Sequence, residues 1–486
     1  QTFAFSNIDK FSTASIVTRL TTDTTNVQNA FQMLMRMAIR APVMLIFSMI
    51  VSFRISRDIS MTFLIILPIL ALALFFIIRS VFPVFTRVFR TYDELNNVVQ
   101  ENVRGIRVVK SFNQERHEIG KFGAISERIY KDFSKGERLI TLNAPLMQFC
   151  IYTCMIVISW LGAKAIIASG NDPALGLTTG NLTALITYTM QILSSLMMLS
   201  MVFAMLTISL SSARRIAEVL EERSDIPQPE QPVMTVRDGA VDFDHVSFVY
   251  ASKADKKVLD DIDLHIRSGE TIGIIGGTGA SKSSLVQLIP RLYDVTGGKL
   301  TLGGVDVRDY DLDTLRGAVA MVLQKNELFS GTIKENLRWG NENATDEELQ
   351  HACVLACADE FISAMPDGYD THIEQGGTNV SGGQKQRLCI ARALLKKPKV
   401  LILDDSTSAV DTRTDAQIQQ ALSTYIPDTT KIIIAQRISS VQNADRIVVL
   451  DDGRIDAVGC HDELLRTCEI YREVYESQQK GGEDDA

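Results

Sequence analysis

The chain has 486 residues, of which 46% are hydrophobic and 22% charged, and its formal net charge at pH 7 is −9. At about 150 residues per domain, this length predicts roughly two to four domains. The composition excludes collagen-like and low-complexity proteins, and the negative charge argues against a nucleic-acid partner. Seven scattered cysteines without a Cys-x-x-Cys pair indicate reduced thiols rather than a disulfide framework.

Four segments are apolar enough to cross a membrane. They are residues 41–53, 59–78, 139–163 and 173–213. The last three carry no charged residue and are long enough to span about 30 Å of hydrocarbon as helices. The first reaches that length only if its helix begins near Phe31 and Arg36 and Arg40 snorkel to the interface. A buried core helix is the alternative for this segment.

The loop between the second and third spans predicts the orientation of the chain. Residues 79–138 hold twelve Lys/Arg against eight Asp/Glu, an excess typical of a cytoplasmic loop. Apolar residues three and four apart predict that this loop is helical. Four spans place both chain ends on one side, so residues 1–30 and everything after about residue 214 are also expected in the cytosol.

The composition changes near residue 222. The acidic segment EERSDIPQPEQPV at 221–233 holds three prolines and has no periodicity, which is typical of a linker. After it, β-rich runs such as VDFDHVSFVY, ETIGIIG, KVLILDD, KIIIAQ and RIVVLDDG alternate with helical stretches, a pattern that predicts a parallel α/β sheet. The predicted organisation is a helical membrane domain at 1–222, a linker at 223–236, an α/β domain at 237–478 and an acidic tail at 479–486.

The string GGTGASKSS follows the apolar strand TIGII directly. It comprises Gly276, Gly277, Thr278, Gly279, Ala280, Ser281, Lys282, Ser283 and Ser284. A Gly-rich turn between a strand and a helix points backbone N–H groups at a phosphate, with Lys282 reaching the β and γ phosphates and Ser283 holding Mg²⁺. The consensus has Gly where this chain has Ser281, and a Cβ there is expected to strain the turn or crowd a phosphate.

Two further strings point to the same chemistry. VLILDD, residues 400–405, is a buried strand that ends in a carboxylate, and Asp404 is expected to hold Mg²⁺ beside Ser283. VSGGQKQRL, residues 380–388, opens a helix with small residues that let an anion approach the bare N–H groups. The plain alternatives are a strand that merely ends in a turn and a solvated glycine turn.

The order of phosphate loop, Gln324, VSGGQ, VLILDD and SAVD resembles the nucleotide-binding domain of ATP-binding-cassette (ABC) transporters. With spans ahead of it, the whole chain resembles an exporter-type half-transporter, so the implied fold is an α-helical transmembrane domain fused to an α/β P-loop ABC domain. The resemblance implies that Tyr250 stacks on adenine, that Gln324 senses the γ-phosphate and its Mg²⁺, and that residues 408–411 link two nucleotide sites. It also implies that two such domains dimerise, so that the signature of one chain completes the ATP site of the other. The signature residues are Ser381, Gly382, Gly383 and Gln384.

Three positions depart from the family pattern. Asp405 stands where most members have a catalytic Glu, Gln436 stands where they have a switch His, and Ser281 replaces the glycine of the phosphate loop. A carboxylate one methylene shorter is displaced from the attacking water, and loss of a positioned base costs roughly 10²- to 10⁴-fold in rate. The nearly intact signature makes the chain similar to the degenerate-site subunit of heterodimeric ABC exporters. By resemblance, the catalytic contributions are assigned to Asp405, Gln436, Gln324, Ser381 and Gly383.

Exporter halves of this family have six spans, and four are predicted here, so we expect the first two spans to be missing from this stretch. The leading hypothesis is a subunit of a plasma-membrane exporter with its ATP-binding domain in the cytosol. Its expected partners are a second half-transporter, the lipid bilayer and an amphipathic or apolar cargo. A homodimeric exporter with slow sites and an ATP-binding regulatory membrane protein that transports nothing are the alternatives.

Overall fold

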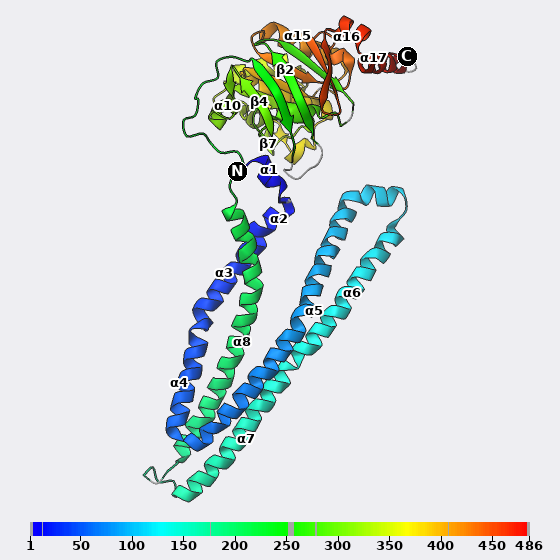
Figure 1. Ribbon diagram of the computed structural model, residues 1–486. Coiled ribbons are helices and arrows are strands. Elements are labelled where there is room, and N and C mark those ends of the chain that lie inside the picture. Colours follow the sequence, from blue (N-terminus) through cyan, green and yellow to red (C-terminus); the bar gives the residue numbers. More distant parts are fainter. Residues whose placement is uncertain are drawn as a thin grey trace. The chain divides into compact units, whose positions relative to one another are not determined.

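A computed structural model describes residues 3–11, 13–174, 176–250, 257–277, 279–406 and 408–483. The chain divides into two compact units, drawn with their elements labelled in Figure 1. One unit is Ala14–Glu221, and the other joins Gln1–Thr13 to Glu222–Ala486. The first thirteen residues therefore group with the α/β unit rather than with the membrane helices.

The first unit consists of long helices. They are α2 (Thr13–Thr18), α3 (Thr24–Met33), α4 (Arg40–Ile55), α5 (Arg57–Ser111), α6 (Glu115–Thr141), α7 (Asn143–Ser169) and α8 (Thr179–Glu221), with π-helical turns at Arg19–Asp23 and Leu34–Ala38. Within the described residues, four helical stretches are long and apolar enough to cross a membrane: Ser15–Ile55, Arg57–Ser111, Glu115–Ser169 and Thr179–Val202. The four predicted spans are confirmed, including the weak first one, whose helix begins well before residue 41.

Helices α5 and α6 form a long antiparallel hairpin beyond the apolar span (Figure 1). Ion pairs join the two helices across their polar faces, Arg128 to Glu94 at 2.8 Å and Lys121 to Glu101 at 3.0 Å. The hairpin turns at residues 112–114, between the end of α5 and the start of α6. This confirms the helical character predicted for residues 79–138 from their apolar spacing.

The second unit is built on a six-stranded sheet in the order β12-β11-β3-β10-β9-β6. Its strands are β3 (Thr271–Gly276), β6 (Val319–Val322), β9 (Val400–Asp404), β10 (Thr430–Ile434), β11 (Arg446–Asp451) and β12 (Arg454–Gly459). Every neighbouring pair is parallel except the β11–β12 hairpin. The predicted parallel α/β sheet is confirmed.

Alternate residues of the central strands enter two different cores. Val400 and Ile402 belong to one buried cluster, and Leu401 and Leu403 belong to the other. Because side chains alternate across a strand, the sheet is covered on both faces, which requires strands that are apolar throughout. This is why the first four residues of VLILDD are all apolar. The two carboxylates follow at the C-terminal end of β9.

The run VDFDHVSFVY was expected in the parallel sheet, and this expectation is wrong. It forms β1 (Val241–Phe248), which lies in a separate antiparallel sheet with the order β2-β1-β4-β5. The other strands of this sheet are β2 (Leu259–Ile266), β4 (Gly297–Leu302) and β5 (Val305–Asp306). Val241 and Phe243 are buried while Asp244 is exposed, and such alternation suits an antiparallel sheet with one solvated face.

Shorter elements complete the α/β unit. The helices are α1 (Phe5–Asp9), α9 (Lys282–Gln287), α10 (Leu312–Ala318), α11 (Ile333–Arg338), α12 (Asp346–Leu355), α13 (Asp359–Ser363), α14 (Gly382–Leu395), α15 (Thr412–Tyr425), α16 (His461–Thr467) and α17 (Glu469–Glu483), and β7 (Gly331–Thr332) pairs with β8 (His372–Ile373). Helix α17 runs to Glu483 and so enters the segment that was predicted as an acidic tail.

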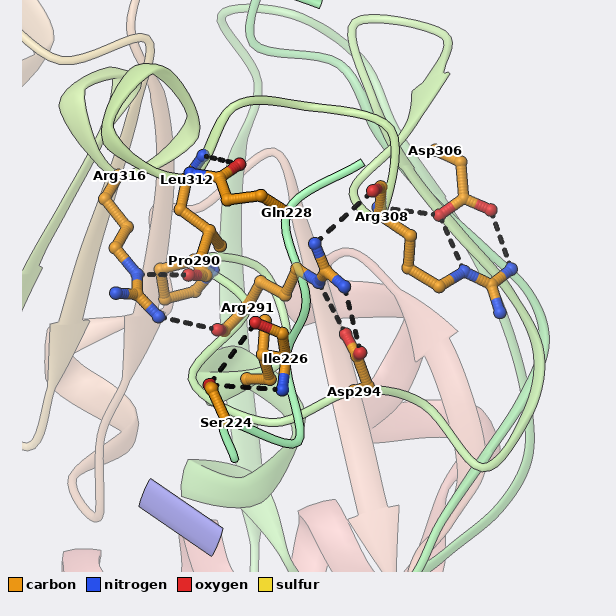
Figure 2. Close-up of polar contacts among 10 residues, drawn as sticks. All are labelled: Ser224, Ile226, Gln228, Pro290, Arg291, Asp294, Asp306, Arg308, Leu312 and Arg316. Carbon is orange, nitrogen blue, oxygen red and sulfur yellow. Dashed lines mark hydrogen bonds and ion pairs between the residues drawn. The ribbon is translucent and has the colours of Figure 1, made fainter. Parts of the chain in front are cut away.

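The proline-containing linker after α8 lies against the α/β unit (Figure 2). Ile226 in this linker is buried, and Gln228 donates a hydrogen bond to Asp311 Oδ1 at 3.1 Å. Figure 2 also shows buried Arg291 held by Asp294 through paired hydrogen bonds of 2.7 and 3.1 Å. The linker is fastened near the start of α10 by the Gln228–Asp311 hydrogen bond and by a backbone β-bridge between Val233 and Tyr310.

Candidate functional site

The phosphate-loop sequence forms a tight turn between β3 and α9. Gly276 ends the strand, and a Cβ at this position would lie 2.3 Å from the carbonyl oxygen of Leu450, so no other residue fits. Gly279 has a φ of +86°, in the left-handed region that favours glycine. Ser281 also has a positive φ, +67°, and its side chain makes no capping hydrogen bond to α9. Thr278 lies outside the described residues.

Ser281 therefore occupies a backbone conformation that costs a non-glycine residue about 1–2 kcal/mol. We expect Ser281→Gly to raise the thermal unfolding midpoint by a few degrees and to leave ATP affinity equal or tighter. Ser281→Ala, which keeps the Cβ but removes the hydroxyl, should not show this gain in stability. Differential scanning fluorimetry and nucleotide titration measure the two quantities. Weaker ATP binding by the glycine variant would show that the serine is adapted to its turn.

Lys282 lies at the start of α9 with its ammonium turned into the phosphate loop. Its Nζ donates to the carbonyl oxygens of Gly276 and Gly277 at 2.7 and 2.8 Å. Burial lowers the pKa of Lys282, while the nearby Asp404 and Asp405 act in the opposite direction. An ammonium held at the mouth of a ring of backbone amides is suited to the phosphates of a nucleotide.

Asp404 closes the same site from the end of β9. It is almost fully buried, and burial raises its pKa, while a hydrogen bond with Ser283 opposes that rise. A hydroxyl and a carboxylate side by side are oxygen ligands of the kind that Mg²⁺ takes together with phosphates. Ser283 and Asp404 are therefore chemically suited to hold the Mg²⁺ of a bound nucleotide.

Asp405 contacts two other candidate site residues, which come from distant parts of the chain. Gln436 Nε2 donates to Asp405 Oδ2 at 2.8 Å, and Gln324 Nε2 donates to the same oxygen at 3.3 Å. Asp405 has a φ of +47°, and the residue is 9% exposed. The structure thus brings these three polar side chains together next to Asp404. One carboxylate oxygen already accepts hydrogen bonds from both amides, which holds the short aspartate against the segment after β10 that carries Gln436.

Tyr250 stands near the phosphate loop with its ring partly exposed. Its edge meets the rings of Phe248 and Tyr293, with centroids 4.8 and 5.0 Å apart. Its hydroxyl forms a 2.8 Å hydrogen bond with Ser284 Oγ. These three contacts fix the orientation of the ring, while 45% of the residue remains exposed to solvent and accessible to a ligand.

Adenine stacking on Tyr250 needs a ring face, so Tyr250→Phe and Tyr250→Trp should keep ATP affinity much closer to the unmutated value than Tyr250→Ala. Stacking is worth about 1–3 kcal/mol per base. The phenylalanine variant loses the Ser284 hydrogen bond, which is worth about 1 kcal/mol or less at this half-exposed position. Titration with a fluorescent ATP analogue gives the affinities. Equal affinities for the alanine and phenylalanine variants would contradict a stacking role.

The signature residues open helix α14. Ser381 is its N-cap, and Ser381 and Gln384 form a reciprocal capping box with distances of 3.3 and 2.9 Å. A Cβ on Gly383 would lie 2.8 Å from the carbonyl oxygen of Ala409. Among the described residues, the N-terminus of α14 makes no hydrogen bond to the phosphate loop of its own chain.

Three residues with contacts near the site received no role from the sequence motifs, although Gln386 lies within the string VSGGQKQRL. Gln386 accepts from the backbone N–H of Ala409 at 3.0 Å and donates to Ser408 at 3.3 Å, which ties the signature helix to the loop after Asp405. Tyr293 donates to Asp9 at 3.0 Å and also contacts Tyr250, and Asn7 is fully buried. No spacing signal identifies them, because each contact joins segments far apart in the chain.

Asn7 fastens the start of the chain to the linker. Its side-chain amide donates to Glu222 Oε1 at 2.6 Å and to the carbonyl oxygen of Arg223 at 2.9 Å. Its carbonyl accepts from the backbone N–H of Asp225 at 3.0 Å. Asn7 thus joins α1 to the start of the linker. The neighbouring Asp9 in turn accepts a hydrogen bond from Tyr293, whose ring contacts Tyr250.

Comparisons with known proteins cover the whole chain. The family model described as ABC transporter matches residues 259–408, and the model described as ABC transporter transmembrane region matches residues 2–211. The uncharacterized ABC transporter ATP-binding protein YfiB of Bacillus subtilis (strain 168) is 37% identical over 478 residues, which is 98% of this chain and 82% of that protein.

A relative with a named activity and a solved structure are also similar. The ATP-dependent lipid A-core flippase of Desulfotalea psychrophila is 32% identical over 467 residues, covering 96% of this chain and 80% of the flippase. The structure of a bacterial Atm1-family ABC exporter with ATP bound aligns with a TM-score of 0.86 and 25% identity, covering 98% of this chain and 83% of that one.

Proposed function

The chain belongs to the ABC transporter family and has the architecture of an exporter half-transporter, a membrane domain fused to an ATP-binding domain, and we propose that it is one subunit of a heterodimeric exporter. In this proposal the chain binds ATP at its own phosphate loop and hydrolyses it poorly. It donates its signature to the partner's site, where hydrolysis takes place.

The single observation that carries this proposal is the Asp405–Gln436 contact. A catalytic carboxylate must reach a water in line with the γ-phosphate, and Asp405 has one methylene fewer than the usual Glu. Its Oδ2 is engaged by Gln436 and Gln324, and Gln436 cannot carry the positive charge of a histidine. A misplaced base costs roughly 3–5 kcal/mol of barrier. Ser281 in its left-handed turn adds a third departure at the same site.

The remaining residues of the site are proposed to bind rather than to hydrolyse. Lys282 and the amides of the loop bind the phosphates, and Tyr250 stacks on adenine. Ser283, Asp404 and Gln324 are the proposed Mg²⁺ ligands, and bound Mg²⁺ would neutralise phosphate charge. The signature at Ser381–Gln384 supports a role toward a second chain, because among the described residues no hydrogen bond joins its helix N-terminus to the phosphate loop of the same chain.

The test compares turnover in the reconstituted pair before and after Asp405→Asn. Because Asp405 is proposed to be a poor base already, we expect its neutralisation to lower the ATPase rate less than threefold. Asp405→Glu should not create a fast site either, because Gln436 and Ser281 remain. The matched control is the equivalent neutralisation in the partner, a Glu→Gln change at the position that corresponds to Asp405. This change should abolish turnover.

Three results would overturn the proposal. Complete loss of hydrolysis in Asp405→Asn would mean that this chain hydrolyses ATP with an aspartate. Steady hydrolysis and transport by a chemically pure single-chain preparation would favour a homodimeric exporter. ATP binding without transport in any combination would favour a regulatory membrane protein.

The cargo class is proposed from the membrane helices. Residues 139–163 carry no charge, so an amphipathic or apolar cargo suits the span better than a small ion does. The flippase among the relatives acts on a lipid of this general kind. The positive-inside excess at 79–138 supports a cytoplasmic ATP-binding domain in a plasma-membrane exporter.

A further inference from the structure

The C-terminal helix α17 hydrogen-bonds to the backbone of the segment after β10 that carries Gln436. Gln478 on α17 donates through Nε2 to the carbonyl oxygen of Gln436 at 2.7 Å. Its Oε1 accepts from the backbone N–H of Ile438 at 2.9 Å. One side-chain amide thus makes two hydrogen bonds to backbone groups on either side of Arg437. No motif or family pattern used above involves α17.

Helix α17 is anchored firmly enough to act as a fixed support. Tyr471 in its first turn is fully buried, and its hydroxyl hydrogen-bonds to His461 Nδ1 at 2.8 Å. Val474 and Tyr475 pack against the main core cluster of the α/β unit. Residues three, four and seven apart share a helix face, so the buried Tyr471 and Val474 direct Gln478 toward the sheet.

The clamp made by Gln478 holds the same residue, Gln436, that makes the proposed catalytic contact. The backbone of Gln436 is held by Gln478, and the side chain of Gln436 reaches Asp405 Oδ2 at 2.8 Å. A displacement of α17 by a few ångströms breaks both bonds to the backbone, since hydrogen bonds weaken steeply beyond about 3.2 Å. The side chain of Gln436 is then free to leave Asp405.

We propose that Gln478 is a positioning residue that holds Gln436 in place over the nucleotide, so that α17 sets how long ATP stays bound at this chain's own site. The inference rests on the proposed function, because it assigns Gln436 to the γ-phosphate of ATP bound at Lys282. It adds a regulatory role for α17. A displacement of α17 would release Gln436 and shorten the time for which ATP stays bound.

The experiment uses the assembled full-length complex and the variants Gln478→Leu and Gln479→Leu. Gln479 is the matched control, because it neighbours Gln478 on α17 and hydrogen-bonds to Tyr475 on its own helix instead of the switch segment. We expect Gln478→Leu to speed release of labelled ATP from this chain by on the order of tenfold, as loss of one to two hydrogen bonds predicts. Gln479→Leu should change it by less than twofold.

A second readout reports the clamp itself. Hydrogen exchange of the Ile438 amide should become faster in Gln478→Leu but not in Gln479→Leu, with unchanged melting temperatures for both. Gln478→Glu keeps an acceptor for Ile438 but places a carboxylate against the Gln436 carbonyl oxygen. It should therefore protect the Ile438 amide and still release ATP faster than the unmutated chain does.

The outcomes separate this inference from the proposed function. Faster exchange at Ile438 with ATP release equal to that of Gln479→Leu would overturn the positioning role. Unchanged exchange at Ile438 would overturn the clamp. Absence of Lys282-dependent ATP binding in the unmutated complex would instead contradict the proposed function, and the same titration detects it.

Discussion

Replacing Gly383 by Asp is expected to cut ATP turnover of the assembled complex by two or more orders of magnitude. In the proposed dimer, the signature helix N-terminus would present its backbone N–H groups and the positive end of the helix dipole to the partner's γ-phosphate, where charge must be stabilised as the bond breaks. A carboxylate there repels the phosphate, and the added Cβ lies 2.8 Å from the carbonyl oxygen of Ala409. Removing one such stabilising donor alone costs about 10²- to 10³-fold.

Ser381→Ala tests the same helix end without the steric conflict at Ala409, since it only removes a hydroxyl. It should lower turnover strongly while leaving ATP bound at Lys282. Gly317→Asp is the matched control, because Gly317 is exposed on α10 and a Cβ there meets nothing within 4 Å. The readouts are steady-state ATPase rate and retention of labelled ATP. Unchanged turnover in both signature variants would remove the signature from the hydrolytic site.

Lys282→Ala is expected to weaken ATP binding to this chain by about ten- to a hundredfold. A charge-assisted hydrogen bond to phosphate contributes about 1.5–3 kcal/mol, and the ammonium is already held in the loop by Gly276 and Gly277. Without it, the nearby carboxylates of Asp404 and Asp405 face the phosphates uncompensated. Titration of the full chain with a fluorescent nucleotide, before addition of the partner, isolates this site.

Lys397→Ala serves as the control for that titration, because Lys397 is exposed and pairs with Glu348 at 2.8 Å on the surface. Its affinity for ATP should match that of the unmutated chain. An unchanged affinity in Lys282→Ala would remove the assigned phosphate site. An equal loss in both lysine variants would point to a general effect of net charge.

The local features of this protein follow from its sequence. Charge-free runs long enough for the bilayer predict spans, because a buried charge in hydrocarbon costs several kcal/mol and a backbone there must satisfy its own hydrogen bonds. The phosphate loop is equally local: Gly276 has no room for a Cβ, Gly279 has a left-handed φ that favours glycine, and Lys282 follows within the same turn. Such features need only neighbours within a few residues, so their residue types identify them.

The tertiary structure alone decided the contacts between distant segments. Asp405 meets Gln436 across 31 residues and Gln324 across 81, and Gln478 reaches Gln436 across 42. The run at 241–250 read as a parallel strand because composition predicts a strand but not its partner, and its pairing with β2 and β4 is antiparallel. Hydrogen bonds between distant segments depend on how strands and helices pack, and packing is set by the buried surfaces of the whole unit rather than by any short string of residues.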